Sequence, residues 1–211
     1  QGVWNLQDTL ITVLASAFGV LVFVLLIYFV YRRNSPRKGK KKNHGREFNR
    51  ERVVSATRRF ANSNSFRFIA PAHLAKNGAA AKLDAIVVGY FGVLGVISLG
   101  YSGEIYGDPG EETWLQVTGD GARTRFENPV NEAAAAVRVV RDALFGQKMK
   151  KVPVEVVYVL ATPDAQLAVP RSMAPMRLKQ YKALLKKDKY LEDCGLDLDT
   201  VEKALREALA E

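Results

Sequence analysis

Cysteine is nearly absent from this 211-residue sequence, which contains only Cys194. A single cysteine cannot form an intrachain disulfide, and this is compatible with a reducing compartment. The two histidines, His44 and His73, do not form a metal-spaced cluster with it, so no metal site is expected. We interpret Cys194 as a small side chain in a turn between helices, because a nucleophilic cysteine would need a nearby base.

Nucleotide-binding signals are also missing. The glycine-rich segment at residues 89–92 has no Lys-Ser/Thr after it, which excludes a P-loop. No internal repeat is recognisable, and no cofactor is expected.

Charged residues are absent from residues 9–31, where nearly every side chain is apolar. At 1.5 Å per residue, such a helix is long enough to cross the roughly 30 Å hydrocarbon core of a bilayer. A cleaved signal peptide would carry its positive charges before the apolar core, whereas here they come after it. We therefore expect a retained transmembrane helix at residues 9–31, preceded by a short extracytoplasmic N-terminus at residues 1–8.

Acidic residues are absent from the next segment, although seven positive charges lie within residues 32–42. Positive residues beside a span favour the cytoplasmic side, so we predict a cell-membrane protein with its C-terminal domain in the cytoplasm. Pro36, Gly39 and Gly45 make residues 32–45 a basic tether rather than a continued helix. The tether is expected to contact anionic membrane lipids, with nucleic acid as the competing partner. The predicted lipid-binding residues are Arg32, Arg33, Arg37, Lys38, Lys40, Lys41 and Lys42.

The remaining sequence, residues 46–211, is predicted to be one α/β domain. Residues 83–107 predict two short apolar strands and the start of a third, separated by glycine-rich turns. Because the first two strands lack polar alternation, they are expected to be buried on both faces. Residues 152–160 predict another central strand. Helices are predicted at residues 46–61, 132–145 (capped by Asn131), 173–187 and 201–209.

The motifs in this stretch resemble those of the nuclease-related domain (NERD) family in the PD-(D/E)xK nuclease superfamily. The family pattern is an Asp, three aliphatic residues, a glycine-rich turn, a strand with Glu-x-Lys, and a Tyr-Ser-Gly-like turn. Asp84 stands at the Asp, Gly92 lies in the glycine-rich turn, and residues 101–107 (YSGEIYG) match the Tyr-Ser-Gly-like turn and its continuation. The resemblance covers roughly residues 46–160. It implies a restriction-endonuclease-like fold, with a mixed central sheet flanked by helices.

The resemblance also implies a site in which Ile97 stands at the Glu and Leu99 at the Lys of the Glu-x-Lys pair. Neighbours i and i+2 of a strand share a face, so both would replace metal-directed groups by aliphatic ones. Asp84 would then be a remnant, and no catalytic residue is expected. Acids from elsewhere could restore a site: Glu51 or Glu104, with Asp108 and Glu155 as further candidates.

Three functions are compatible with these observations. The first is a membrane-anchored, catalytically degenerate nuclease-like domain that serves as a binding or assembly module with a protein partner, and is not an enzyme. The second is a membrane-proximal nucleic-acid-binding protein or a metal-dependent nuclease with a rearranged site. The third is a structural small subunit of a larger membrane complex.

Overall fold

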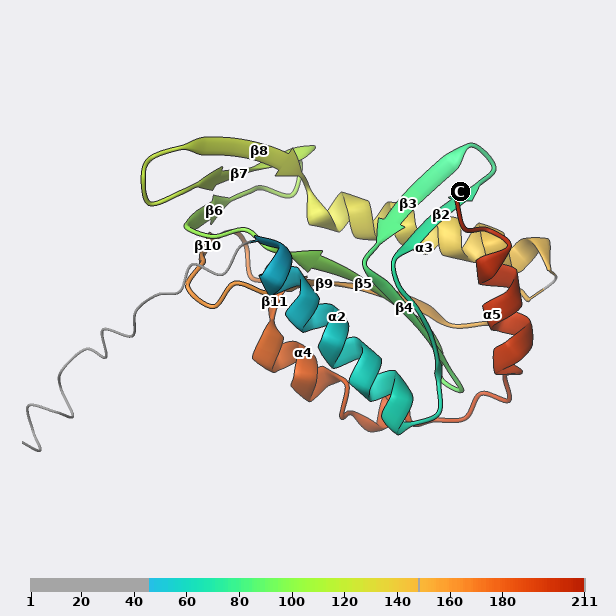
Figure 1. Ribbon diagram of the computed structural model, residues 1–211. Coiled ribbons are helices and arrows are strands. Elements are labelled where there is room, and N and C mark those ends of the chain that lie inside the picture. Colours follow the sequence, from blue (N-terminus) through green and yellow to red (C-terminus); the bar gives the residue numbers. More distant parts are fainter. Residues whose placement is uncertain (1–45, 148, 211) are drawn as a thin grey trace, which may run out of the picture. The chain divides into compact units, whose positions relative to one another are not determined.

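The computed structural model describes residues 46–147 and 149–210, drawn in colour in Figure 1. The predictions for residues 1–8, 9–31 and 32–45, including the lipid-binding residues of the tether, lie outside the described part of the chain. Within that part, no helix combines the length and the apolar character that a membrane crossing requires.

The domain is built on a five-stranded mixed sheet with the order β1-β4-β5-β9-β11. Its first three strands are antiparallel, whereas β9 and β11 run parallel to their neighbours. This confirms the predicted mixed α/β architecture. The strands are β1 (Arg67–Ile69), β4 (Ala85–Gly89), β5 (Gly92–Leu99), β9 (Val154–Leu160) and β11 (Met176–Arg177).

The centre of the sheet is the β4–β5 hairpin, in which every residue of both strands is buried. The predicted burial on both faces is therefore confirmed, and it explains the continuous apolar sequence. The hairpin turns at Gly92, which has a positive φ of 125°. A Cβ at Gly92 would lie 2.3 Å from the carbonyl oxygen of Pro153, so only glycine fits beside the start of β9.

Helix α2 (Arg46–Ser63) packs against β1, β4 and β5, and α3 (Pro129–Gly146) packs against β9 and β5. The start of α3 differs from the prediction, because Asn128 rather than Asn131 caps it. The Asn128 side chain accepts a hydrogen bond from the Val130 N–H at 3.0 Å. Pro129 then occupies the first turn, where its missing N–H leaves no bond unmade.

Two further sheets lie beside the single mixed sheet that the sequence predicted. The strands around residues 104–106, 113–118 and 123–126 are read from the sequence, with a hairpin turn at residues 119–121, but not their arrangement as a sheet of their own. A four-stranded sheet has the order β10-β6-β7-β8, and the hairpin β2–β3 forms a separate two-stranded sheet. The sequence offered a signal for this hairpin, because Asn77 and Gly78 both adopt positive φ at its turn. The strands are β2 (Ala72–Lys76), β3 (Ala79–Leu83), β6 (Glu104–Tyr106), β7 (Thr113–Val117), β8 (Arg123–Glu127) and β10 (Gln166–Ala168).

The C-terminal segment adds α4 (Leu178–Leu184), the 3₁₀ turn η1 (Asp188–Tyr190) and α5 (Leu198–Arg206). Helix α4 is shorter than predicted because residues 176 and 177 extend as β11 beside β9. It lies next to α2 (Figure 1), where the hydroxyls of Thr57 and Tyr181 are hydrogen-bonded at 2.8 Å. Cys194 lies exposed between η1 and α5, in agreement with the predicted turn.

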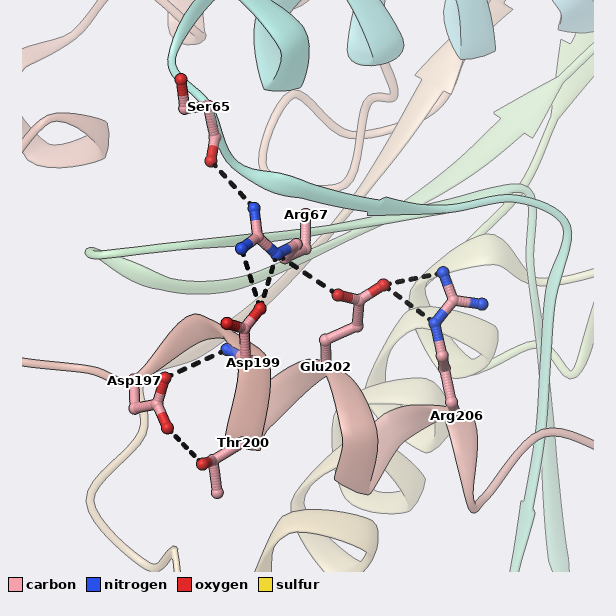
Figure 2. A network of polar contacts seen from close by, with 7 residues as sticks. All are labelled: Ser65, Arg67, Asp197, Asp199, Thr200, Glu202 and Arg206. Carbon is pink, nitrogen blue, oxygen red and sulfur yellow. Dashed lines mark hydrogen bonds and ion pairs between the residues drawn. The ribbon is translucent and has the colours of Figure 1, made fainter.

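A polar network fastens α5 to the edge strand β1 (Figure 2). Arg67 of β1 binds the carboxylate of Asp199 at 2.8 Å and that of Glu202 at 3.4 Å, and Glu202 also binds Arg206 at 2.7 Å. Asp197 caps the start of this helix, and its side chain accepts the Asp199 N–H at 3.2 Å. The C-terminal segment is thus attached to the same sheet that carries the candidate site.

Candidate functional site

Asp84 lies between β3 and β4, where β4 and β5 begin to separate. Its backbone N–H donates to the Val96 carbonyl oxygen at 2.9 Å, and Ala85 pairs with Val96. Asp84 is therefore beside Ile97 at the end of the ladder. Its carboxylate accepts the Ser98 N–H at 2.5 Å, so the side chain continues the strand pairing that the backbone no longer makes.

Arg50 reaches Asp84 from the first turns of α2. Its Nη2 donates to Asp84 Oδ1, whereas Ser98 donates to Oδ2, so both carboxylate oxygens are engaged. The Asp84 side chain is only 15% exposed and that of Arg50 is 36% exposed. A guanidinium therefore occupies the open side of this carboxylate, and its positive charge balances the buried negative one.

Ile97 and Leu99 stand on one face of β5 and are 3% and 5% exposed. In the sheet, Ile97 pairs with Tyr158 and Leu99 with Leu160 of β9. Both belong to the hydrophobic core, so the face of β5 beside Asp84 is apolar.

The acids proposed from sequence to restore a site lie elsewhere. Glu51 is exposed and accepts a hydrogen bond from Ser55 at 3.2 Å, so the α2 side chain that reaches Asp84 is Arg50 and not Glu51. Glu104 is exposed on β6 and accepts a hydrogen bond from the Tyr106 hydroxyl.

The two further candidates are also remote or differently engaged. Asp108 is exposed beyond the end of β6. Glu155 pairs in register with Leu94, three positions from Ile97, which corresponds to about 10 Å along the strand. Its carboxylate binds Lys189 at 2.8 Å and the Tyr190 hydroxyl at 3.0 Å.

Glu132 in the first turn of α3 is the acid that the sequence analysis missed. Burial raises the pKa of Glu132, and the neighbouring Glu127 and Asp84 raise it further, whereas Arg50 and Lys82 oppose this. The start of α3 thus places a second carboxylate within electrostatic reach of Asp84. No motif in the sequence signals this, since the approach depends on how α3 packs against the sheet.

A metal ion would find few ligands here. Asp84 and Glu132 interact electrostatically beside the expected position, and both oxygens of Asp84 already accept hydrogen bonds. In the described part of the chain, no three His, Cys, Asp or Glu side chains gather closely enough to hold a metal ion.

A comparison of the sequence with known protein families finds a match. The nuclease-related domain (NERD) aligns with residues 46–161, more than half of the chain. The chain belongs to the NERD family. No match to it was found among curated proteins or among solved structures.

The NERD match begins with α2 and ends one residue after β9, so it contains Arg50, Asp84, Ile97, Leu99 and Glu132. The segment from residue 162 onwards, with β10, β11, α4 and α5, lies outside the matched range. The candidate site is therefore a feature of the NERD domain itself.

Proposed function

We propose that the chain is a membrane-anchored, catalytically degenerate NERD domain that serves as a binding or assembly module. The observation that carries this proposal is the set of contacts around the Asp84 carboxylate. Its two carboxylate oxygens are taken by Arg50 and the Ser98 N–H, and its β5 neighbours Ile97 and Leu99 are buried aliphatic residues.

Electrostatics supports the proposed loss of activity. Metal-dependent cleavage of a phosphodiester requires a cation held by at least two carboxylates beside the scissile phosphate. A cation approaching Asp84 would meet the Arg50 guanidinium at the carboxylate it must bind. Like charges at contact distance repel by several kcal/mol at an effective dielectric constant of about 20.

Membrane anchoring is supported by the sequence of residues 9–31 and by the basic residues after them. A domain that is held at the membrane and lacks a catalytic site can act by binding other molecules through its folded surface. We therefore propose a protein partner or membrane complex, together with lipid contact through the tether.

A metal-dependent nuclease with a rearranged site is the second candidate, and Glu132 is the observation that favours it. Asp84 and Glu132 interact electrostatically, and Glu127 lies close enough to Glu132 to raise its pKa. For this candidate, Arg50 would have to leave Asp84 and the carboxylates of Asp84, Glu127 and Glu132 would have to move closer together than they lie in the structure.

One experiment separates the two functions. Purified full-length chain in detergent is incubated with single- and double-stranded DNA and with RNA, in Mg²⁺ or Mn²⁺, beside the Asp84→Ala variant. We expect no cleavage by either protein and no Mn²⁺ binding by titration calorimetry. Metal-dependent cleavage that disappears in both Asp84→Ala and Glu132→Gln would contradict the proposal and establish the second candidate.

A second experiment tests whether metal binding can be restored to this site by substitution. Arg50→Glu combined with Ile97→Glu exchanges the blocking cation and one aliphatic side chain for carboxylates beside Asp84. We expect this double variant to gain Mn²⁺ binding and to unfold at a higher temperature when Mn²⁺ is added, because the ion binds only the folded state. The matched control, Arg50→Gln with Ile97→Leu, should show neither effect.

A further inference from the structure

A basic groove lies between α2 and α4, away from the candidate site. It has a volume of about 220 Å³ and contains three exposed cationic side chains, those of Arg52, Arg59 and Lys182. The Thr57–Tyr181 hydrogen bond fixes the two helices against each other beneath it. The remaining lining residues are Phe48, Glu51, Ser55, Ala56 and Leu178.

The positive side chains of this groove lie on the same side of their helix because of their spacing in the sequence. Arg52 and Arg59 are seven residues apart on one side of α2, and Lys182 reaches the groove from α4. In the described residues, none of these three side chains forms an ion pair. Glu51 is the acid among the lining residues, so three cations against one carboxylate leave the groove positive, and a positive groove attracts anions.

The position of the groove along the chain indicates which anions it meets. Helix α2 begins at Arg46, four residues after the last lysine of the basic run at residues 32–42. Residues 32–45 span at most about 50 Å when fully extended, so a chain anchored at residues 9–31 keeps α2 near the bilayer surface. Such a short connection gives the domain a high effective concentration at that surface.

We propose that the basic groove docks on the anionic membrane surface and takes a phosphate-bearing lipid headgroup between α2 and α4. This inference rests on the membrane anchoring proposed above. Docking would orient the NERD domain, with the α2–α4 face toward the lipid and the four-stranded sheet available to other partners.

Lipid is favoured over nucleic acid by the chemistry of the groove. The α4 side contributes Lys182, whose flexible stem carries a compact charge that adapts to a fluid array of phosphates. The basic run at residues 32–42, which precedes α2 in the sequence, adds charge of the same sign. A nucleic acid would need to compete with lipid that the anchor supplies continuously.

The test measures how close the groove comes to lipid in the full-length chain. A fluorophore is placed on Ser63→Cys in a Cys194→Ser background. Ser63 is exposed and extends the Arg52–Arg59 stripe by one further turn. The chain is reconstituted into phosphatidylcholine vesicles with or without phosphatidylserine, both containing a lipid with a quencher on its headgroup. A label on Ala134→Cys, exposed on α3, serves as the reference position.

We expect quenching at position 63 only with phosphatidylserine, and its reversal by high salt, which screens exposed charges. Arg59→Gln with Lys182→Gln should lower the ratio of docked to undocked label roughly thirtyfold, or about fivefold per cation. The matched control, Arg138→Gln with Arg141→Gln, removes the same charge from the exposed face of α3 and should leave quenching unchanged.

Three results would overturn the inference. The first is equal quenching with and without phosphatidylserine, and the second is an equal loss of quenching in the α3 control variant. The third is a groove variant, Arg59→Gln with Lys182→Gln, that loses duplex DNA binding in a parallel binding assay but keeps its quenching by lipid. Failure of the anchoring proposal is recognised separately, because alkaline carbonate would then extract the chain from the vesicles. Quenching by vesicles added to the extracted chain still reports on the groove in that case.

Discussion

The ion pair between Arg50 and Asp84 is predicted to be a structural contact that stabilises the fold. Asp84→Ala removes the acceptor of the Ser98 N–H and the partner of Arg50. A hydrogen bond to a charged group contributes about 1.5–3 kcal/mol, and the exposure of Arg50 reduces its share. We therefore expect Asp84→Ala to lower the free energy of unfolding by about 3 kcal/mol.

Two companion variants show how much of this loss of stability comes from the Ser98 hydrogen bond and how much from the Arg50 ion pair. Asp84→Asn keeps an acceptor for the Ser98 N–H and should cost only about 1–2 kcal/mol. Arg50→Gln leaves a mostly buried carboxylate with one donor and should cost about 1–2 kcal/mol. In the double variant Asp84→Ala/Arg50→Gln, a coupling energy of about 1 kcal/mol is expected because the two side chains touch.

The assay is urea unfolding of the full-length chain at a fixed detergent concentration. The fluorescence of Trp114, which is fully buried, reports on the domain when Trp4 is replaced by Phe. Residues held for catalysis are commonly strained, and their removal often stabilises a protein. A neutral or stabilising Asp84→Ala, or a midpoint that rises with Mn²⁺ in wild type alone, would refute the structural role.

Three other changes test the site and the topology. Ile97→Asp should destabilise the fold by a few kcal/mol in the same assay, because it buries an unpaired carboxylate, whereas Ile97→Leu should cost less than about 1.5 kcal/mol; equal effects would contradict this. Burial, with Glu127 and Asp84 nearby, raises the pKa of Glu132, so the folded state holds this proton more tightly than the unfolded chain. The stability cost is then present above the folded pKa and disappears as the pH falls toward the ordinary value of about 4.3. Glu132→Gln should stabilise the chain at neutral pH and not near pH 4, as measured by melting temperature; a pH-independent difference would exclude this origin. A membrane-impermeant maleimide should label a cysteine at position 2 but not the exposed Cys194 in intact cells, and the reverse pattern would invert the predicted topology.

The local pattern of the sequence predicted the central hairpin because its signal is local. Uninterrupted β-branched and aliphatic residues between glycines suit only strands that are covered on both faces, and β4 and β5 are buried throughout. The same reasoning found β9, whereas the helical spacing of apolar residues found α2. It missed the β2–β3 hairpin, although Asn77-Gly78 marks the turn, because the alanine-rich flanks carry little strand signal.

The sequence by itself determined which residues stand on β5 and that Asp84 precedes β4. Those facts depend only on the order of the chain and on the two-residue period of a strand. Only the tertiary structure decided what surrounds Asp84. Residues 50 and 84 are 34 positions apart, and their contact depends on the angle at which α2 crosses the sheet. The approach of Glu132 and the meeting of α2 with α4 in a basic groove arise in the same way. Charge pairing between distant elements is set by packing geometry, which no short sequence window contains.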